Sequence, residues 1–366
     1  MGQTQNNKPF SFYSLSLPYG PRELKEGLKR IVDHIGPTHI LRQGLFYPPH
    51  IKKGELLDII RGIYRDGYIP VTSLICQPMA DDMDIGIELW GTDLDVQYIS
   101  DNISVCDIFG IRWAFVAGIE PDSGLSFHEQ VDFVLNMMRK VLNKAGFGFQ
   151  HLIRTWYYIG GILKKEQEIG RYDLLNRARN KFYDVIWEEK REYPASTGIG
   201  TYNDNIVMDG IALSPSSGAR VIRLENPLQI SAFDYDIPFE KRPRFCRAIL
   251  VENNGSGIIF VSGTASIRGA DVSYPDNVED QTYVTIENIK RLISRDNLSR
   301  YGIDWDISLN DVKDIRVYVK DKSYYPKVRE ICSKFFGNIP QLYLVADICR
   351  PTLLVEIEAV VIKGSA

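Results

Sequence analysis

The sequence lacks the features that would point to a nucleic-acid or membrane partner. Its 366 residues include 43 Lys and Arg against 47 Asp and Glu, so the formal net charge is −4 and no basic excess is available to neutralise phosphates. No apolar run approaches the ~20 residues that span a bilayer, and residues 1–8 are polar. We therefore expect a cytoplasmic protein with no nucleic-acid partner and no membrane partner.

Cysteine and histidine are also scarce. The five cysteines form an odd set without a Cys-x-x-Cys pair, which disfavours both a disulfide framework and a thiolate zinc site. The five histidines include no His-Glu-x-x-His pattern. We expect no metal site and reduced thiols at Cys76, Cys106, Cys246, Cys332 and Cys349.

The composition that is present is globular, with 44% apolar and 25% charged residues. Because this length exceeds what one core usually organises, we expect two domains, 1–225 and 226–366, divided near the breaks at 214–218 and 226–227. Helical spacing predicts helices at 22–35, 55–66, 126–145, 172–190, 279–295 and 325–336. Strand patterns fall at 72–76, 85–90, 113–119, 151–158, 205–213, 219–223, 245–251, 257–263, 314–320, 341–347 and 353–363. The pattern indicates an α+β fold of two lobes, each a mixed β-sheet with helices packed on one face.

The last predicted strand carries two acidic residues in an apolar setting. Successive side chains of a strand alternate between its faces, so Glu356 and Glu358 share one face while Val355, Ile357 and Ala359 share the other. If protein covers the acidic face, at least one carboxyl is desolvated and its pKa rises. A carboxyl that keeps its proton at neutral pH is suited to donate it.

The order of elements in the last hundred residues resembles the RidA fold. The resemblance rests on Val261–Ile267, a following helix, Asp314–Lys320 and Leu353–Val360. It implies a RidA-like domain at 226–366. A similar succession of elements at 70–190 suggests that residues 1–225 contain a degenerate RidA-like lobe, although no residue-level repeat is visible.

Six ordered segments between about residues 85 and 362 resemble the chorismatase family, which cleaves chorismate on a RidA-like scaffold. They are Ile153–Ile159, Gly170–Arg179, Tyr193–Gly200, Pro243–Ala248, Ser262–Ile267 and Asp347–Glu358. The resemblance implies protonation of the enolpyruvyl ether of chorismate, attack of water on the resulting oxocarbenium ion, and release of pyruvate with a dihydroxycyclohexadiene carboxylate or 3-hydroxybenzoate. Such a reaction in secondary-metabolite biosynthesis needs neither metal nor organic cofactor.

The resemblance also implies roles for individual residues. Glu356 falls on the family's proton donor, and Cys349 on a cysteine of the 3-hydroxybenzoate-forming branch. A dianionic substrate needs fixed cations, and arginine offers a carboxylate two parallel donors. The candidate substrate-binding residues are Arg154, Tyr157, Thr197, Gly263, Thr264 and Arg329.

Each of these residues also has an ordinary structural interpretation. Arg154 could lie on a strand edge, Arg329 could be a solvated helix residue, and Cys349 a small buried thiol. Glu358 is as readily structural as catalytic. The pair Gly263-Thr264 could simply end a strand, although a glycine there would let a ligand approach the backbone.

Several positions depart from the family pattern and leave other functions open. Tyr157 replaces an Asn, Ala270 and Tyr274 stand where histidines are usual, and Lys320 replaces an Arg; Phe239–Pro243 replaces a Tyr-Gly-Pro loop. The alternatives are a different small carboxylate, enol-ether or imine substrate, or a non-catalytic binding protein. RidA-type deamination is disfavoured because Pro340 is not followed by an arginine. The chain is expected to be a monomer or a RidA-like trimer.

Overall fold

The computed structural model describes residues 9–35, 39–64, 69–187, 192–214 and 218–364. The polar segment 1–8, the ends of the helices predicted at 55–66 and 172–190, and residues 215–217 of the predicted domain break lie outside these ranges.

The amino-terminal unit is built on a four-stranded sheet. Its elements in chain order are β1 (Ser11–Leu17), α1 (Pro21–Ile35), β2 (Ile40–Phe46), α2 (Lys53–Ile63), β3 (Thr72–Ile75) and β4 (Ile85–Gly91). The strand order is β1-β4-β2-β3, with β2 and β3 parallel and the other pairs antiparallel.

The middle and C-terminal units each contain a six-stranded mixed sheet. The middle unit comprises β5 (Gln97–Ser100), β6 (Ile103–Ile108), β7 (Ile111–Ile119), α3 (Phe127–Lys144), β8 (Leu152–Gly160), the hairpin β9–β10 (Lys165–Glu166 and Ile169–Gly170), α4 (Arg171–Trp187), β11 (Ala195–Thr201) and β12 (Ile206–Leu213). The C-terminal unit comprises β13 (Arg220–Leu224), β14 (Ala248–Asn253), β15 (Ser256–Ala265), the hairpin β16–β17 (Ile267–Arg268 and Asp271–Val272), α5 (Val278–Ile293), α6 (Arg295–Ser299), β18 (Val312–Val319), α7 (Tyr325–Phe336), β19 (Gln341–Val345) and β20 (Val355–Lys363).

The three units repeat one topology. The order β1-β4-β2-β3 recurs as β7-β12-β8-β11 and as β15-β20-β18-β19, and in the two larger sheets two further strands extend the edge beyond β7 and beyond β15. The expected α+β fold with two lobes of mixed sheet is therefore confirmed, and the structure adds a third, smaller sheet. The first strand of the C-terminal sheet, β13, spans Arg220–Leu224 and therefore precedes the boundary expected between residues 225 and 226.

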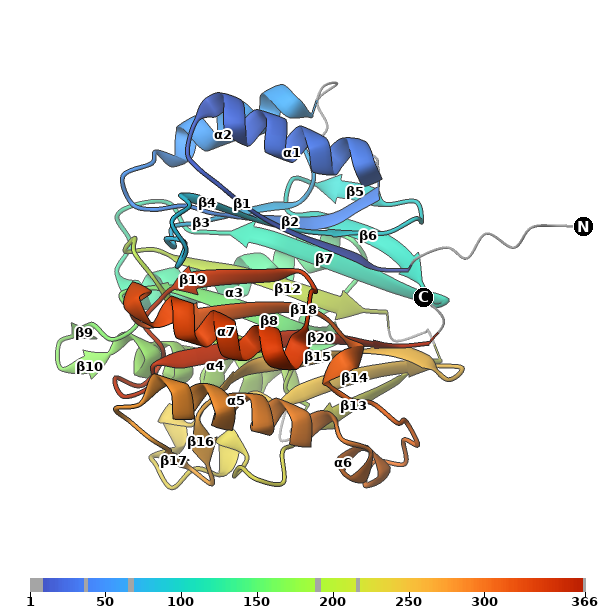
Figure 1. Ribbon diagram of the computed structural model, residues 1–366, viewed down its shortest axis with the longest axis vertical. Coiled ribbons are helices and arrows are strands. Elements are labelled where there is room, and N and C mark those ends of the chain that lie inside the picture. Colours follow the sequence, from blue (N-terminus) through green and yellow to red (C-terminus); the bar gives the residue numbers. More distant parts are fainter. Residues whose placement is uncertain (1–8, 36–38, 65–68, 188–191, 215–217, 365–366) are drawn as a thin grey trace, which may run out of the picture.

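The helices cover the outer faces of the sheets, and the inner faces meet in a shared centre. Figure 1 shows α1 and α2 outside the amino-terminal sheet, and α5 and α7 outside the C-terminal sheet. Each helical layer packs on its own sheet through a separate apolar cluster. A fourth cluster joins side chains from all three units, including Trp90, Trp113, Trp156, Phe260 and Tyr318. Side chains from different units can therefore come together in one site where two units meet.

Candidate active site

The cavity that contains the predicted acid lies between the middle and C-terminal units. It has a volume of about 500 Å³, which suits a small-molecule ligand. Its wall combines the first turns of α4, the connection that precedes β14, the end of β15 and the start of β20. The lining residues are Tyr172, Asp173, Asn176, Tyr235, Asp236, Ile237, Lys241, Pro243, Phe245, Arg247, Gly263, Ala265, Ile267, Ala270, Asp271, Cys349, Arg350, Leu353 and Glu356.

Glu356 lies near the start of β20, only 5% exposed, and its side chain faces this cavity. The alternation expected for this strand is confirmed, because Val355, Ile357 and Ala359 pack under the helices on the opposite face. Burial raises the pKa of Glu356 to about 8, and the negative charge of Glu358 adds to the increase. The carboxyl group is therefore protonated at neutral pH and can act as an acid.

Gly263 lies directly against the Glu356 carboxyl group. The pairing of β15 with β20 shifts register between Val261 and Thr264, which places Gly263 in a bulge. A Cβ atom at Gly263 would stand 2.1 Å from Glu356 Oε1, so a larger residue would displace the acid. The backbone N–H of Gly263 donates to Thr197 Oγ1 at 3.0 Å. The glycine therefore makes room for the acid, and its amide is already engaged by Thr197.

Two arginines line the cavity beside the acid. Arg247 is buried; one of its terminal nitrogens donates to the backbone oxygen of Ile230 at 2.9 Å and to Tyr235 Oη at 2.8 Å. Its Nε has no hydrogen-bond partner among the described residues. Arg350 is half-buried and donates to the backbone oxygen of Ala270 at 2.7 Å. The guanidinium carbons of Arg247 and Arg350 lie 6.0 and 5.2 Å from the centroid of the Tyr235 ring.

Cys349 shares the cavity with Glu356, as predicted from the sequence. Burial raises the pKa of its thiol to about 12, and the nearby Glu356 adds to the increase. The sulfur therefore carries its proton at neutral pH. A thiol in this state is a weak acid beside a bound ligand, not a thiolate nucleophile.

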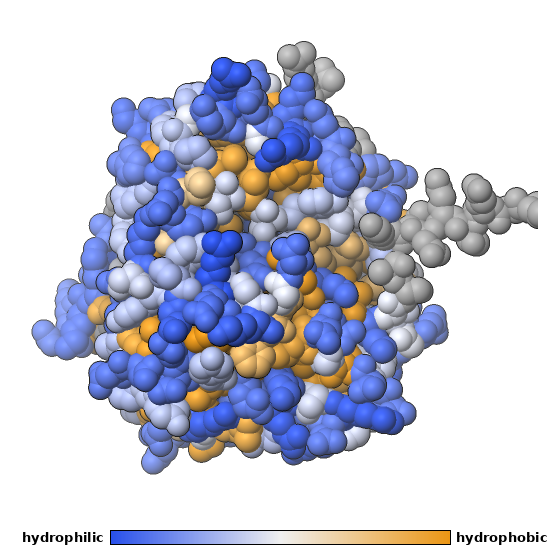
Figure 2. All heavy atoms as spheres, in the orientation of Figure 1, coloured by the Kyte–Doolittle hydropathy of each residue, from blue (hydrophilic) through white to orange (hydrophobic). Residues whose placement is uncertain are grey.

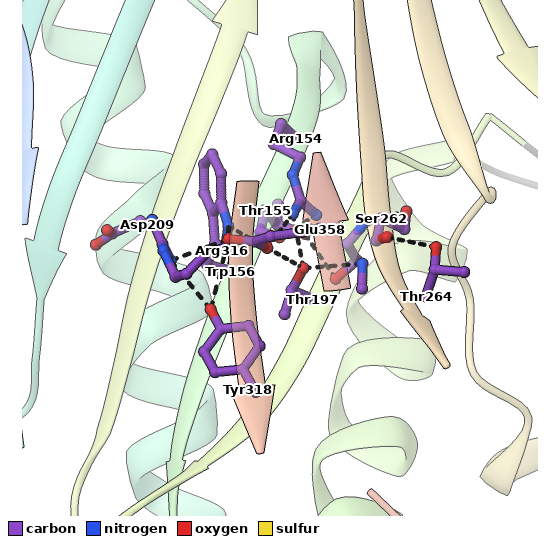
Figure 3. A network of polar contacts seen from close by, with 12 residues as sticks. Arg154, Thr155, Trp156, Thr197, Asp209, Ser262, Thr264, Arg316, Tyr318 and Glu358 are labelled. Atoms are coloured by element: carbon purple, nitrogen blue, oxygen red, sulfur yellow. Dashed lines mark hydrogen bonds and ion pairs between the residues drawn. The ribbon is translucent and has the colours of Figure 1, made fainter. Parts of the chain in front are cut away.

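Arg154 lies behind the cavity and forms part of a buried charge network (Figure 3). It is 2% exposed, and Nη2 donates to Glu358 Oε2 and to Thr197 Oγ1, each at 2.6 Å. Thr197 also donates to Glu358 Oε2 at 2.5 Å. Arg154 and Thr197 therefore bind Glu358 and do not line the cavity.

Glu358 keeps its negative charge despite burial. Burial alone would raise its pKa, but Arg316, Arg154 and hydrogen bonds from Thr197 and Trp156 hold the pKa below its usual value. Two carboxyl groups on one strand face are thus held in opposite protonation states.

The remaining candidate residues lie outside this cavity. Tyr157 is fully buried in the core of the middle unit, where its hydroxyl lies 3.2 Å from Tyr183 Oη. Thr264 donates to the backbone oxygen of Ser262 at 2.8 Å. Arg329 is on α7, where it donates to Tyr325 Oη at 2.9 Å and lines a different cavity. The structure thus brings together Glu356, Cys349 and Gly263, and not the other five predicted site residues.

Of the positions that depart from the family pattern, Ala270 lines the cavity, whereas Tyr274 is 54% exposed beyond it. Lys320 donates to the backbone oxygen of Pro351, on the segment that leads into β20. No cluster of three or more metal-ligating side chains occurs among the residues that the structure describes. Within the same ranges, no helix has the length and apolar character needed to cross a membrane.

Comparisons with known proteins show which sequences and folds this chain resembles. The family model "Chorismatase FkbO/Hyg5-like, N-terminal" matches residues 88–212, and the model "Endoribonuclease L-PSP" matches residues 242–363. A 3-hydroxybenzoate synthase of Streptomyces hygroscopicus is 32% identical over 281 residues, which cover 75% of this chain and 81% of that protein. A chorismatase of the same species is 32% identical over 285 residues, covering 75% and 78%.

A chorismatase crystal structure shares the fold across nearly the whole chain, with a TM-score of 0.73 at 22% identity over 98% of this chain and 100% of that one. The L-PSP match confirms the RidA-like character of the C-terminal part, because RidA proteins belong to that family. The chain therefore belongs to the chorismatase FkbO/Hyg5-like family of chorismate-cleaving enzymes.

Proposed function

We propose that this protein hydrolyses the enolpyruvyl ether of chorismate, with Glu356 as the general acid. The observation that carries the proposal is a buried carboxyl group with a pKa of about 8 that faces a cavity lined by two arginines. An acid catalyst requires a carboxyl group that carries its proton at the working pH.

The arginines suit the charge of the substrate. Chorismate carries two carboxylates, and burying either without a partner would cost several kcal/mol. Arg247 and Arg350 are the guanidinium groups in the cavity, so we assign to them the carboxylate binding that the sequence had suggested for Arg154 and Arg329.

The proposed reaction balances with one water molecule. Glu356 transfers its proton to the methylene carbon of the enolpyruvyl group, which leaves an oxocarbenium ion at the ether carbon. Water adds to that carbon and returns a proton to the Glu356 carboxylate. The hemiketal then breaks its bond to the ring oxygen, which takes up the remaining hydroxyl proton, and gives pyruvate and a dihydroxycyclohexadiene carboxylate.

Cys349 is the residue that we connect with the choice of product. Formation of 3-hydroxybenzoate requires loss of one further water from the ring, and a neutral thiol in the cavity can assist by donating a proton. The similarity to a 3-hydroxybenzoate synthase supports this branch.

A related enol-ether carboxylate is the second candidate substrate. The favouring observation is Ala270, which lines the cavity at a position where the family pattern has a larger, titratable side chain.

Purified protein should release pyruvate from chorismate in a lactate-dehydrogenase-coupled assay. Glu356→Gln keeps the size of the side chain but removes its acidity, so turnover should fall by roughly 10²–10⁴-fold. The wild-type rate should also decline above about pH 8, where Glu356 loses its proton.

The Cys349→Ala variant should still release pyruvate. Mass spectrometry should show its ring product changing from 3-hydroxybenzoate to the diol.

If the wild-type protein released no pyruvate, the proposal that chorismate is its substrate would be wrong. If Glu356→Gln were fully active, the assignment of the acid would be wrong even though hydrolysis stood.

A further inference from the structure

A second cavity lies where the C-terminal unit meets the amino-terminal unit. Its volume is about 740 Å³, and its lining comes from β1 and α1 on one side and from α7 and β19 on the other. The two units are joined there by Ser14, which accepts from the backbone N–H of Gln341 at 2.9 Å and donates to its backbone oxygen at 3.2 Å. Figure 1 shows α1 at the top of the molecule and α7 below it, with β1 and β19 at heights between the two helices.

The repeated topology makes this cavity the counterpart of the catalytic one. The catalytic cavity lies between the last helix of the middle unit, α4, and the strand of the next unit that corresponds to β1, which is β15. The second cavity lies between the last helix of the C-terminal unit, α7, and the first strand of the amino-terminal unit, β1. α4 presents Tyr172 and Asn176 to its cavity, and α7 presents Tyr325 and Arg329 with the same spacing of four residues.

The second cavity has no counterpart of the catalytic acid. Glu356 lies two residues before Glu358, a ligand of Arg316, and Gly86 lies two residues before Glu88, another ligand of Arg316. Across the strands, Glu356 faces Ala265 and Gly86 faces Ser16. A Cβ atom at Gly86 would stand 2.4 Å from the sulfur of Met79, so no acidic side chain fits there. This cavity can bind a ligand but cannot protonate it in the same way.

The charge of the second cavity favours an anion. Arg30 and Arg329 line it together with one carboxylate, Asp81. Among the described residues neither arginine forms an ion pair, and the one hydrogen bond of Arg329 goes to the neutral Tyr325. Two unpaired guanidinium groups beside one cavity match the planar geometry of a carboxylate.

The apolar part of the wall favours a ring. The aromatic side chains Phe12, Tyr13, Tyr325 and Tyr343 line the cavity, with the aliphatic Leu15 and Ile31. Figure 2 shows hydrophobic residues gathered just below α1, between hydrophilic groups. Flat apolar side chains next to guanidinium groups are suited to hold an unsaturated six-membered ring through its faces while its carboxylate is paired.

We propose that the cavity between α1, β1, α7 and β19 is a second, non-catalytic site for a ring-bearing carboxylate of the size of chorismate. The site goes beyond the proposed hydrolysis, because it contains no counterpart of Glu356. Arg30 and Arg329 bind the carboxylate, and the aromatic wall contacts the ring.

The test is a calorimetric titration of chorismate into the Glu356→Gln variant, which cannot consume the ligand. We expect two sites per chain. Adding Arg30→Ala and Arg329→Ala should weaken one site by at least ten-fold and leave the other unchanged, whereas adding Arg247→Ala should weaken only the other. The matched control carries Arg22→Ala and Lys334→Ala, which remove the same charge from α1 and α7 at positions outside the cavity.

The outcomes separate this proposal from the proposed function. If the titration showed only the site that depends on Arg30 and Arg329, and none that depends on Arg247, the result would count against chorismate hydrolysis and would support the second site. A single site that is insensitive to Arg30→Ala and Arg329→Ala would overturn the second site. So would inorganic phosphate binding there as tightly as chorismate, since the ring would then contribute nothing. Wild-type turnover at saturating chorismate should be unchanged by the Arg30 and Arg329 substitutions.

Discussion

At the scale of single residues, the site depends on the contrast between Glu356 and Glu358. The two carboxyl groups lie on the same face of β20, yet the pKa of Glu356 is raised to about 8 and that of Glu358 is lowered. The difference follows from their partners, because Glu358 is paired with Arg154 and Arg316 whereas Glu356 faces the cavity. The ionised Glu358 in turn helps to keep the proton on Glu356.

Glu356→Gln should change the pH dependence of stability. A carboxyl group with a raised pKa in the folded state keeps its proton while the unfolded chain ionises, so wild-type stability falls as pH rises from about 4.5 to about 8. The glutamine cannot ionise and escapes this loss, which by the size of the pKa shift is about 5 kcal/mol. The free energy of unfolding of the variant, measured with urea, should therefore increase relative to that of the wild type between pH 5 and pH 8.5.

The exposed Glu26, which pairs with Arg22 on the surface of α1, offers the control substitution Glu26→Gln. Because this ion pair is exposed, the substitution should cost less than about 1 kcal/mol at each pH. An equal effect of Glu356→Gln at both pH values would contradict the raised pKa.

The sequence predicts the acid better than it predicts the cations. Glu356, Cys349 and Gly263 follow from the strand pattern and the family resemblance, and all three line the cavity. Arg247 and Arg350 lie inside segments that carried the resemblance, but nothing local distinguishes an arginine in a cavity from one in the core. Arg154 shows the difficulty, because its partner Glu358 is 204 positions away along the chain.

At the scale of elements, the sequence patterns do not predict β2 and β11, and both strands carry polar or small residues on their buried faces. β2 contains Arg42 and Gln43, both buried among charged or polar partners from other units or strands. β11 has the sequence Ala-Ser-Thr-Gly-Ile-Gly-Thr, whose small and polar residues are typical of a loop. In the structure this strand contacts β15 of the C-terminal unit. These strands owe their stability to tertiary partners, which local propensity does not reveal.

The bulge in β15 gives the prediction that belongs to this scale. In Gly263→Ala the new methyl group would overlap the Glu356 carboxyl, so the acid must turn away from its place in the cavity. Chorismate turnover should fall by about 10²-fold, the range for a misplaced acid, while the melting temperature changes little because a side-chain end can move. The control is Gly170→Ala, because a Cβ atom at Gly170 has no other atom within 4 Å. Gly257→Ala is unsuitable, because its Cβ atom would overlap the backbone of Val251. Full activity of Gly263→Ala would show that this contact does not position the acid.

At the scale of the whole molecule, three copies of one topology enclose their inner faces within a single chain. The faces that separate RidA-like subunits would bury against one another are already covered by the other units. We therefore expect no RidA-like trimer of this chain. Light scattering coupled to size-exclusion chromatography should give a mass other than three times 41.8 kDa; a trimer would mean that a different surface drives assembly.

The ion pairs at the centre tie the three units together. Arg42 pairs with Asp209 of the middle unit at 2.8 Å and lies 3.9 Å from Glu88. Arg316 of the C-terminal unit pairs with Glu88 at 2.9 Å through Nε and with Glu358 at 3.0 Å. Since Arg154 pairs with Glu358, three arginines and three carboxylates alternate in one buried network that balances in charge. Its members come from all three units, so it selects one way of assembling them.

Glu88→Ala should therefore destabilise the protein although Glu88 is remote from the cavity. It leaves Arg316 and Arg42 in the interior with one carboxylate each, and breaking a buried ion pair from one side costs about 3–5 kcal/mol. Glu26→Ala removes a carboxylate from an exposed pair, which should cost less than about 1 kcal/mol. Urea unfolding of the two variants measures the contrast. Restoring the charge balance with Glu88→Ala and Arg316→Met together should recover part of the loss, because the methionine needs no partner. If Glu88→Ala cost no more than Glu26→Ala, the central ion pairs would not be what holds the three units in register.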